Sequence, residues 1–201
     1  ASTGGTLPMF TSCCPAWVNY VENTAPEMIP HLSTCRSPIG MLSSVIKNIF
    51  PKKIGKEARD IISVGIMPCT AKKDECERPQ LRTKDGVHET DYIITSRELA
   101  SMIKEAGINF NELADAECDN FYSEATGGGA IFCNTGGVME AAVRSAYKFV
   151  EHKDLVPIEL TEIRGSDLGI KTAEVTIKGK TFGIAVAHGI KNAMKMIEKV
   201  K

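Results

Sequence analysis

The stretch Asp60-Ile61-Ile62-Ser63-Val64-Gly65-Ile66 decides the fold class. It is a short apolar run rich in β-branched residues, which favours a buried strand of a parallel sheet. A second run, Tyr92-Ile93-Ile94-Thr95, has the same character, and Ser96 with the segment from Glu98 to Ala106 predicts a capped helix that ends at Gly107. This alternation of strands and helices is typical of α/β proteins, so we expect short, mostly parallel sheets flanked by helices.

Helices are also expected on the N-terminal side of this strand. The apolar spacing after Pro15 predicts a helix that ends near Pro26, with Pro15 in the first turn, where no amide donor is needed. A second helix is predicted from about Ile39 to Phe50, and Pro51 is expected to stop it.

The C-terminal part of the chain predicts a β-hairpin. The segments Glu174 to Ile177 and Thr181 to Val186 flank the tripeptide Lys178-Gly179-Lys180, which suits a tight turn. A last helix is predicted from about Ile190 to Val200. We therefore expect a C-terminal hairpin that leads into a helix.

A glycine-dense stretch, Thr126 to Gly137, precedes helical spacing from Val138 to Val150. It suggests a phosphate loop, but it lacks the lysine of a P-loop motif and follows no clear strand. Glycine permits close approach of two backbones. We therefore favour close packing of a helix on a sheet or on a bulky cofactor over nucleotide binding.

Composition excludes several classes of function. The 201 residues are 43% hydrophobic, which suits one large domain or two small ones. The 24 basic and 25 acidic residues include no polybasic run, which argues against nucleic acid and anionic membranes as partners. The longest apolar runs fall far short of the ~18 residues that cross a bilayer, so no membrane insertion is expected. Seven scattered cysteines are unlike a disulfide framework and indicate a reducing compartment, the cytoplasm.

Two cysteine motifs carry the candidate chemistry. The first, Thr11-Ser12-Cys13-Cys14-Pro15-Ala16-Trp17, puts two thiols at a predicted helix N-terminus, where unpaired amides favour the thiolate that binds metal or exchanges protons. Because adjacent side chains point in different directions, one thiol can bind metal while the other faces a different partner. The second motif, Met67-Pro68-Cys69-Thr70-Ala71-Lys72-Lys73-Asp74-Glu75, follows the predicted strand, and ligands gather at such carboxyl ends.

Cys14 and Cys69 are the candidate ligands of one iron-sulfur cluster, because cysteine thiolates are its usual ligands, four for a 4Fe-4S cube. Without other motifs, two such distant cysteines are more often small buried residues. Zinc is a weaker alternative, since the sequence has no C-x-x-C pair. Lys72 either donates hydrogen bonds to an anionic ligand or is a solvated surface lysine. Glu75 is expected to be a helix-surface partner of a lysine or arginine.

The remaining cysteines and histidines are treated as structural. Cys35, Cys76 and Cys118 lie in polar or helical surroundings with no partner spacing. His188 follows a predicted strand, where a lone histidine is usually just hydrogen-bonded.

Three motifs together resemble, in order and spacing, the catalytic domain of the iron-only (FeFe) hydrogenases. They are the two cysteine motifs and the run from Gly128 to Ala142, and the likeness covers nearly the whole chain. It implies an iron-only hydrogenase-like α/β fold and reversible reduction of protons to dihydrogen, with ferredoxin or another electron carrier as partner. The implied cofactors are a 4Fe-4S cluster joined through a cysteine to a two-iron subcluster with CO, CN and dithiolate ligands.

The resemblance also implies roles for single residues. Cys14 and Cys69 match two metal ligands of the cube. Cys13 matches the thiol that relays protons to the dithiolate, and Ser33 matches a serine in the proton path beyond it. Lys72 matches a lysine that hydrogen-bonds a cyanide, so Cys13, Lys72 and Ser33 form the expected catalytic set. The expected cofactor-binding set is Met67, Pro68, Lys72 and Ser37.

The sequence departs from this family pattern at its ends. The third cysteine motif, which supplies the other two cube ligands, is expected after the last helix but does not occur before Lys201. We therefore expect residues 1–201 to be a partial catalytic domain, an internal fragment that needs the remaining segments of its parent hydrogenase.

Single departures keep two other functions open. Ile39 stands where many members of the family have glutamine, and Cys133 where many have glycine, so we expect altered cofactor surroundings and retain a sensory hydrogenase-like protein as an alternative. Cytosolic iron-sulfur assembly factors share the fold and are a second, non-catalytic alternative. They usually lack the first of the two adjacent cysteines, so Cys13 argues against them.

Overall fold

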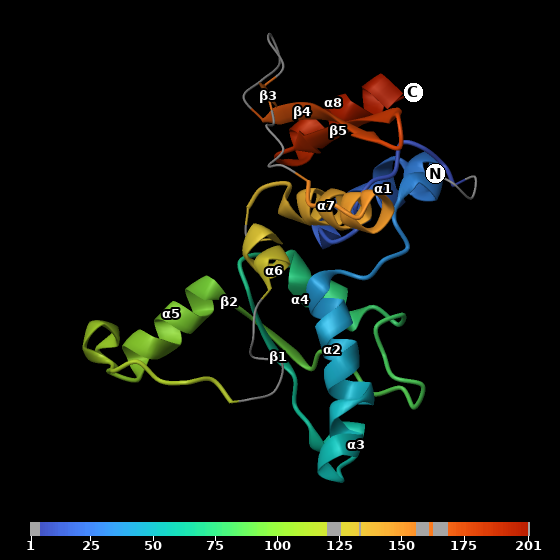
Figure 1. Cartoon of the computed structure of the whole chain (residues 1–201). Helices are drawn as coiled ribbons and strands as arrows, with labels where there is room; N and C mark the ends of the chain where they lie inside the picture. Colours follow the sequence, from blue (N-terminus) through green and yellow to red (C-terminus); the bar gives the residue numbers. More distant parts are fainter. Residues whose placement is uncertain (1–4, 120–125, 133, 156–160, 163–168, 201) are drawn as a thin grey trace. The chain divides into compact units, whose positions relative to one another are not determined.

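A computed structural model describes residues 5–119, 126–132, 134–155, 161–162 and 169–200. The chain divides into two compact units, Ala1–Glu117 and Cys118–Lys201, which we call unit 1 and unit 2. Figure 1 labels the α-helices and strands. The 3-10 helices are Pro26–His31, Ala58–Asp60 and Phe110–Glu112. The α-helices and strands are α1 Pro15–Thr24, α2 Pro38–Asn48, α3 Phe50–Ile54, β1 Val64–Met67, α4 Ala71–Glu77, β2 Tyr92–Thr95, α5 Ser96–Glu105, α6 Gly127–Phe132, α7 Gly137–Glu151, β3 Thr161–Glu162, β4 Ile170–Ile177, β5 Lys180–Ala187 and α8 Ile190–Val200.

The sheet of unit 1 consists of β1 and β2. The two strands pair in parallel, with Val64 opposite Tyr92 and Met67 opposite Thr95. The predicted parallel pairing is therefore confirmed. β1 begins at Val64, later than predicted, and a 3-10 turn that ends at Asp60 precedes it.

The prediction that the first strand is buried is correct for only one face of β1. Gly65 is buried, and a Cβ at this position would overlap the Cδ1 atoms of Ile39 in α2 and Ile93 in β2. On the opposite face Val64 and Ile66 are 48% and 52% exposed. Helix α2 thus covers only the face that carries Gly65, and glycine there allows the close approach of helix and strand.

Proline residues mark helix starts in unit 1. α1 begins at Pro15 and α2 at Pro38, because the locked φ of proline and its missing amide suit the first helical turn. The prediction that Pro51 stops the second helix is wrong. α2 already ends at Asn48, and Pro51 lies in the first turn of the short helix α3.

A capping box starts α5. The Thr95 hydroxyl accepts a hydrogen bond from the Glu98 amide at 3.2 Å, and the Glu98 carboxylate accepts one from the Thr95 amide at 2.7 Å. The cap is thus Thr95 and not Ser96, and the helix ends at Glu105, two residues before the predicted end at Gly107.

A buried lysine joins α2 to the segment before β1. The Lys47 side chain is 1% exposed, donates to the Ala58 carbonyl at 3.2 Å and pairs with Asp91 at 2.7 Å. Asp91 also accepts the Ser63 amide at 2.6 Å. Since this buried charge has its carboxylate and carbonyl partners, it secures the position of α2 against the sheet.

Unit 2 contains an antiparallel sheet in the order β3-β4-β5. The predicted hairpin is confirmed and is longer than expected, and α8 has the predicted bounds. The turn residues of the hairpin, Lys178 and Gly179, both have positive φ, 47° and 72°, as the favoured two-residue hairpin turns require. α7 contacts β4 and runs along the hairpin, and α8 contacts β5 (Figure 1).

The glycine-dense stretch serves close packing in unit 2. Gly136 has φ +80°, and a Cβ there would overlap the side chain of Val186 in β5. A Cβ at Gly137 would overlap the Ile131 carbonyl oxygen of α6. The structure thus supports close packing of helix on helix and helix on sheet.

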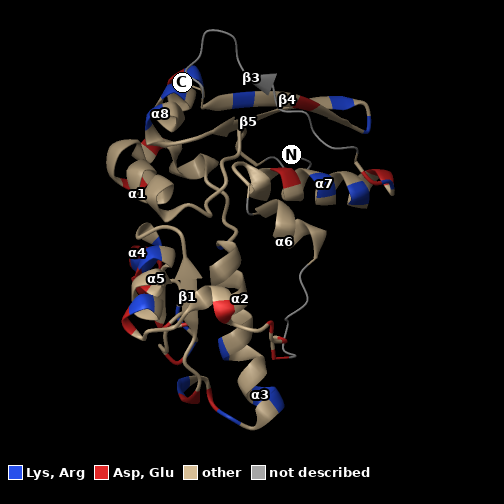
Figure 2. Cartoon of the chain, turned by 90° about the vertical axis from the view of Figure 1, so that its left-hand side faces the viewer, with Lys and Arg blue, Asp and Glu red and all other residues tan. Residues whose placement is uncertain are grey.

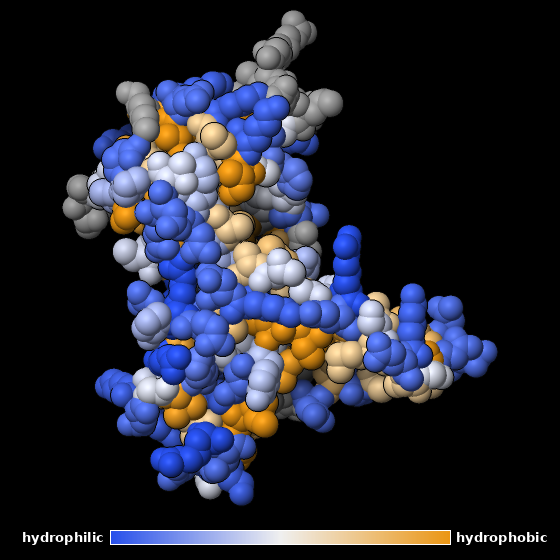
Figure 3. Space-filling view, turned by 180° about the vertical axis from the view of Figure 1, so that it is seen from behind, coloured by the Kyte–Doolittle hydropathy of each residue, from blue (hydrophilic) through white to orange (hydrophobic). Residues whose placement is uncertain are grey.

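The surfaces of the units are mixed in charge. Figure 2, in which the ribbon is coloured by residue type, shows basic and acidic residues interspersed along each unit, and Figure 3 shows that hydrophobic side chains also reach the surface. Within the described part of the chain, no helix combines the length and apolar character that a membrane span requires.

Candidate functional site

The first cysteine motif lies where α1 begins. Cys14 is the N-cap residue of α1 in an extended conformation, and its carbonyl accepts the Val18 amide at 3.1 Å. The Cys14 side chain is exposed and forms no cap hydrogen bond, whereas Cys13 is partly buried. The thiol of Cys14 is therefore accessible at a helix N-terminus, as the motif predicted.

The second cysteine motif joins β1 to α4. Met67 ends the strand and is partly buried, while Pro68 and Cys69 are exposed. The Cys69 carbonyl accepts the Lys72 amide at 3.3 Å, so the chain turns directly from Cys69 into the first turn of α4. Cys69 thus also lies beside a helix N-terminus.

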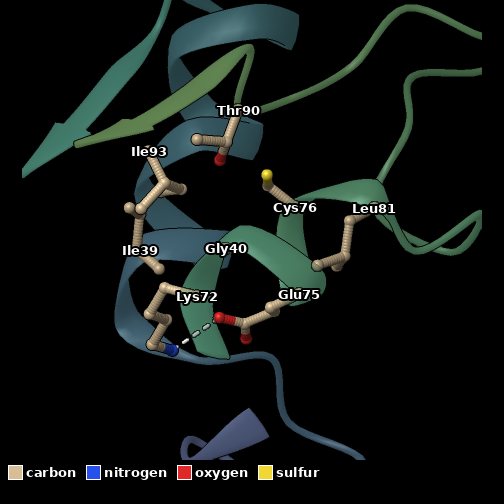
Figure 4. Close-up of a pocket in the computed structure, with 8 residues that line it drawn as sticks. All are labelled: Ile39, Gly40, Lys72, Glu75, Cys76, Leu81, Thr90 and Ile93. Atoms are coloured by element: carbon tan, nitrogen blue, oxygen red, sulfur yellow. Dashed lines mark hydrogen bonds and ion pairs between the residues drawn. The ribbon is translucent and has the colours of Figure 1, made fainter. Parts of the chain in front are cut away.

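Lys72 links the two motifs. Its Nζ donates a hydrogen bond to the Cys13 carbonyl at 2.8 Å and forms an ion pair with Glu75 Oε2 at 2.5 Å. The side chains of Lys72 and Glu75 are only 12% and 11% exposed. Figure 4 shows the two side chains joined at α4, among the residues that line a pocket. Lys72 is therefore not a solvated lysine. The expected basic partner of Glu75 is present, but the expectation that Glu75 lies on the helix surface is wrong.

Helices α1 and α4 contact each other, and the paired residues follow the same order along both helices. Cys13 contacts Lys72, Asn19 donates to Asp74 at 2.8 Å, and Arg78 donates to Glu22. Since residue numbers rise together in both helices, the two helices run in the same direction. Their N-termini, with the exposed thiols of Cys14 and Cys69, consequently lie at the same end of the pair.

Ser33 lies in a turn held against the first motif. The segment around Phe10 pairs with this turn, since the Ser33 amide donates to the Phe10 carbonyl at 2.8 Å. Ser12 Oγ donates to the Cys35 carbonyl at 2.7 Å, and Ser33 Oγ accepts the Cys35 amide at 3.2 Å. The structure thus brings the turn that carries Ser33 beside the residues that precede Cys13.

Ser37 has a local structural task. It caps α2, is 2% exposed, and its Oγ accepts the Gly40 amide at 3.2 Å. A Ser at this position is the usual N-cap. The structure does not test its predicted cofactor contact, which stays a prediction.

Lys72 and Glu75 also line a small pocket. Burial raises the pKa of the Cys76 thiol, which borders the pocket and donates to the Lys73 carbonyl at 3.1 Å. This burial agrees with a structural Cys76, whereas Cys35, Cys118 and His188 are exposed. Cys133 lies outside the described residues. The lining residues, shown in Figure 4, are Ile39, Gly40, Lys72, Glu75, Cys76, Leu81, Thr90 and Ile93.

Sequence reasoning missed the polar partners that position these residues. The exception is Glu75, whose basic partner was expected and is Lys72, at the i,i+3 spacing of a helical ion pair. Nothing local connects Arg78 with Glu22, which lie 56 positions apart. Within the described ranges, no three Cys, His, Asp or Glu side chains form a group that could hold a metal ion.

The comparisons agree with the pattern of motifs. The family model "Iron only hydrogenase large subunit, C-terminal domain" matches residues 1–201. The chain is 45% identical over 195 residues to the periplasmic Fe hydrogenase large subunit of Nitratidesulfovibrio vulgaris, covering 97% of this chain and 46% of that protein. It is 30% identical over 209 residues to the cytosolic iron-sulfur assembly component 3 of Bos taurus, covering 97% and 42%.

The fold has solved counterparts. An apo FeFe-hydrogenase variant from Chlamydomonas reinhardtii superposes with a TM-score of 0.84 at 37% identity, covering 96% of this chain and 55% of that one. The chain spans less than half the length of the curated hydrogenases that it matches.

Proposed function

Because the chain belongs to the family of the iron-only hydrogenase large subunit, C-terminal domain, we propose that it is part of a hydrogenase that reversibly reduces protons to dihydrogen. In this proposal residues 1–201 form a partial catalytic domain that works with further segments of the same enzyme and with ferredoxin or another electron carrier. The observation that carries the proposal is the contact of Lys72 Nζ with the Cys13 carbonyl, which joins the two cysteine motifs.

The chemistry of the site fits two of the four thiolate ligands of a 4Fe-4S cluster. Cys14 and Cys69 offer exposed thiols at the same end of the α1–α4 pair. The described residues contain no larger metal-binding group, so the other ligands have to come from elsewhere in the protein. When bound, this cluster and its two-iron partner supply the iron at which electrons and protons combine.

Lys72 suits the binding of an anionic ligand such as the cyanide of the two-iron unit. Its ammonium group has three N–H donors. Two of them are used by the Cys13 carbonyl and Glu75. The third can donate a charge-assisted hydrogen bond, while the first two keep the group in place. Met67 and Pro68 are proposed to line the same site.

Cys13 is proposed to hold and transfer the proton. It is partly buried and directly precedes the proposed ligand Cys14, so its side chain points away from that of its neighbour. The turn that carries Ser33 is hydrogen-bonded beside this segment, which supports Ser33 as the next group of a proton path. A thiol is a better proton relay than an alcohol at neutral pH, because its ordinary pKa is much lower.

The test uses the full-length hydrogenase that contains this chain, loaded with both cofactors. Cys13→Ser is expected to keep the iron content and to lower hydrogen production by about 10²-fold or more, the usual contribution of a general acid or base. Cys69→Ala is expected to lower the iron content itself. Cys118→Ala, which replaces another exposed thiol, is the control and should change neither quantity.

The iron-sulfur assembly component is the competing function, favoured by its 30% identity over nearly the whole chain. A fully loaded wild-type protein that produces no hydrogen would reject the enzymatic proposal in favour of that function or of a sensory one. Normal iron loading of Cys69→Ala would remove Cys69 from the proposed ligands.

We also propose the cytoplasm as the location. All six described cysteines are free thiols, which suits a reducing compartment. The Nitratidesulfovibrio relative, in contrast, is named as periplasmic. Fractionation of cells that express the full-length protein distinguishes the two compartments.

A further inference from the structure

A cluster of four polar side chains joins α1 to α4 beyond the candidate site. Arg78 donates from Nη1 and Nη2 to the two carboxylate oxygens of Glu22, at 2.9 and 2.8 Å, and its Nη2 also donates to Asn19 Oδ1. Asn19 donates from Nδ2 to Asp74 Oδ2 at 2.8 Å. We call Asn19, Glu22, Asp74 and Arg78 the α1–α4 clasp.

The clasp forms one seam between the two helices. Asn19 and Glu22 are three residues apart in α1 and so share one face of that helix. On the other side, Asp74 lies in α4 and Arg78 directly follows it. The fork of Arg78 on Glu22 is the planar, two-bond geometry that gives arginine its directional specificity. It also holds the pKa of Glu22 below its usual value through hydrogen bonds. The clasp therefore defines both the separation and the rotation of the helices.

The position of the clasp matters for the two thiols. Cys14 caps α1 and Cys69 lies two residues before α4, so each thiol moves with its helix. The Lys72–Cys13 contact joins the helices at the end where the thiols lie, and the clasp joins them further along. Contacts at both places leave little freedom for the helix N-termini to separate.

We propose that the α1–α4 clasp positions Cys14 and Cys69 for cluster binding before any cluster is present. The inference rests on the proposed function. A pre-arranged pair of ligands lowers the ordering cost of binding, so the clasp accelerates and strengthens cluster loading. Arg78 and Glu22 are positioning residues in this scheme, since neither contacts the cluster.

Ordinary stabilisation of the fold predicts a different outcome. The side chains of Arg78 and Glu22 are 24% and 41% exposed, and ion pairs of this exposure contribute little to global stability. If the clasp only stabilised the fold, its loss would change cluster loading no more than the loss of another α4 ion pair. Lys73 offers that comparison, because it pairs with Glu98 of α5 and not with α1.

The experiment measures anaerobic reconstitution of the full-length hydrogenase with iron and sulfide. The readouts are the rate of cluster absorbance, the electron paramagnetic resonance signal of the reduced cluster and the bound iron per chain. Arg78→Gln is expected to slow loading about threefold to fivefold, the factor that corresponds to a partly exposed ion pair. Lys73→Gln is expected to load like the wild type. The exchanged pair Glu22→Arg with Arg78→Glu should recover most of the loss, because the charges attract again.

Two results would overturn the inference: loading of Arg78→Gln at the wild-type rate, or equal slowing in Lys73→Gln. Should Arg78→Gln fail to fold, Glu22→Gln replaces it, since it removes only the charge of the more exposed partner. Failure of the proposed function is recognised separately, because a fully loaded wild-type protein would then produce no hydrogen, and wrongly assigned ligands would leave Cys14→Ala and Cys69→Ala with their full iron content.

Discussion

Two adjacent lysines of α4 allow a direct measurement of what burial does to an ion pair. Lys72 and Lys73 each have a carboxylate at 2.5 Å, Glu75 and Glu98 respectively. The first pair has side chains 12% and 11% exposed, whereas the second pair has 46% and 48%. We predict that Lys72→Gln lowers the free energy of unfolding of unit 1 much more than Lys73→Gln does.

The size of the stability loss in Lys72→Gln depends on Glu75, the carboxylate that stays buried without its lysine. Removing one member of a fully buried pair costs about 3–5 kcal/mol, because the other charge stays desolvated and unpaired. Since Glu75 keeps about a tenth of its exposure and glutamine can still donate one hydrogen bond, we expect a loss of about 2–4 kcal/mol for Lys72→Gln. The loss for Lys73→Gln should be smaller and should vanish at about 1 M salt, where charges are screened within about 3 Å.

The assay uses a built-in reporter of unit 1. Trp17 is the single tryptophan of the chain and stacks on Tyr20 with ring centroids 6.1 Å apart. Urea unfolding followed by Trp17 fluorescence therefore reports on the unit that contains both lysines. Each variant is measured at low salt and at high salt. Its urea midpoint is compared with that of the wild type, after checking that the slope of the unfolding free energy against urea concentration is unchanged.

One result would refute the reasoning. If the two variants lose equal stability at both salt concentrations, the burial of the Lys72–Glu75 pair has no energetic consequence. The use of this pair to hold an ammonium group for a ligand would then lose its physical basis.

Two further predictions concern α5 and the glycine-dense stretch. Hydrogen bonds from Lys73 and Thr95 lower the pKa of Glu98 from 4.5 to about 2. The stabilising contribution of this carboxylate is therefore complete above the ordinary pKa and is lost as the pH falls through 2. A nuclear magnetic resonance titration of Glu98 should give this low pKa, and Glu98→Gln should make the stability less dependent on pH between these two values. Gly137→Ala places a Cβ on a carbonyl of α6 and should lower the stability of unit 2 by about 1–3 kcal/mol in urea unfolding followed by circular dichroism. Gly127→Ala, with open space around the added Cβ, should not lower it, and equal losses in both variants would contradict the steric explanation.

Much of the secondary structure could be predicted because its signals are local. Pro15 has the fixed φ of a first helical turn, and Gly179 allows the positive φ of a hairpin turn. The run from Tyr92 to Thr95 is rich in β-branched residues and forms β2 with these bounds. The candidate site was predicted less by such rules than by resemblance, since Cys14 and Cys69 are far apart in the chain.

One position could not be predicted, because its local signal fits two outcomes. The local chemistry of Pro51 allows it either to end one helix or to begin the next. Because α2 already ends at Asn48, Pro51 lies in the first turn of α3.

The sequence by itself indicated the two strands of unit 1, the hairpin and the helices α1, α2, α5, α7 and α8, because proline, glycine and β-branched residues act on their own backbone, but it did not indicate the short helices α3 and α6. It also displayed the two cysteine motifs. Only the tertiary structure decided that Glu75 is buried against Lys72 and that Arg78 holds Glu22. The physical reason is that burial and charge pairing depend on which helices pack together, and no local pattern specifies that.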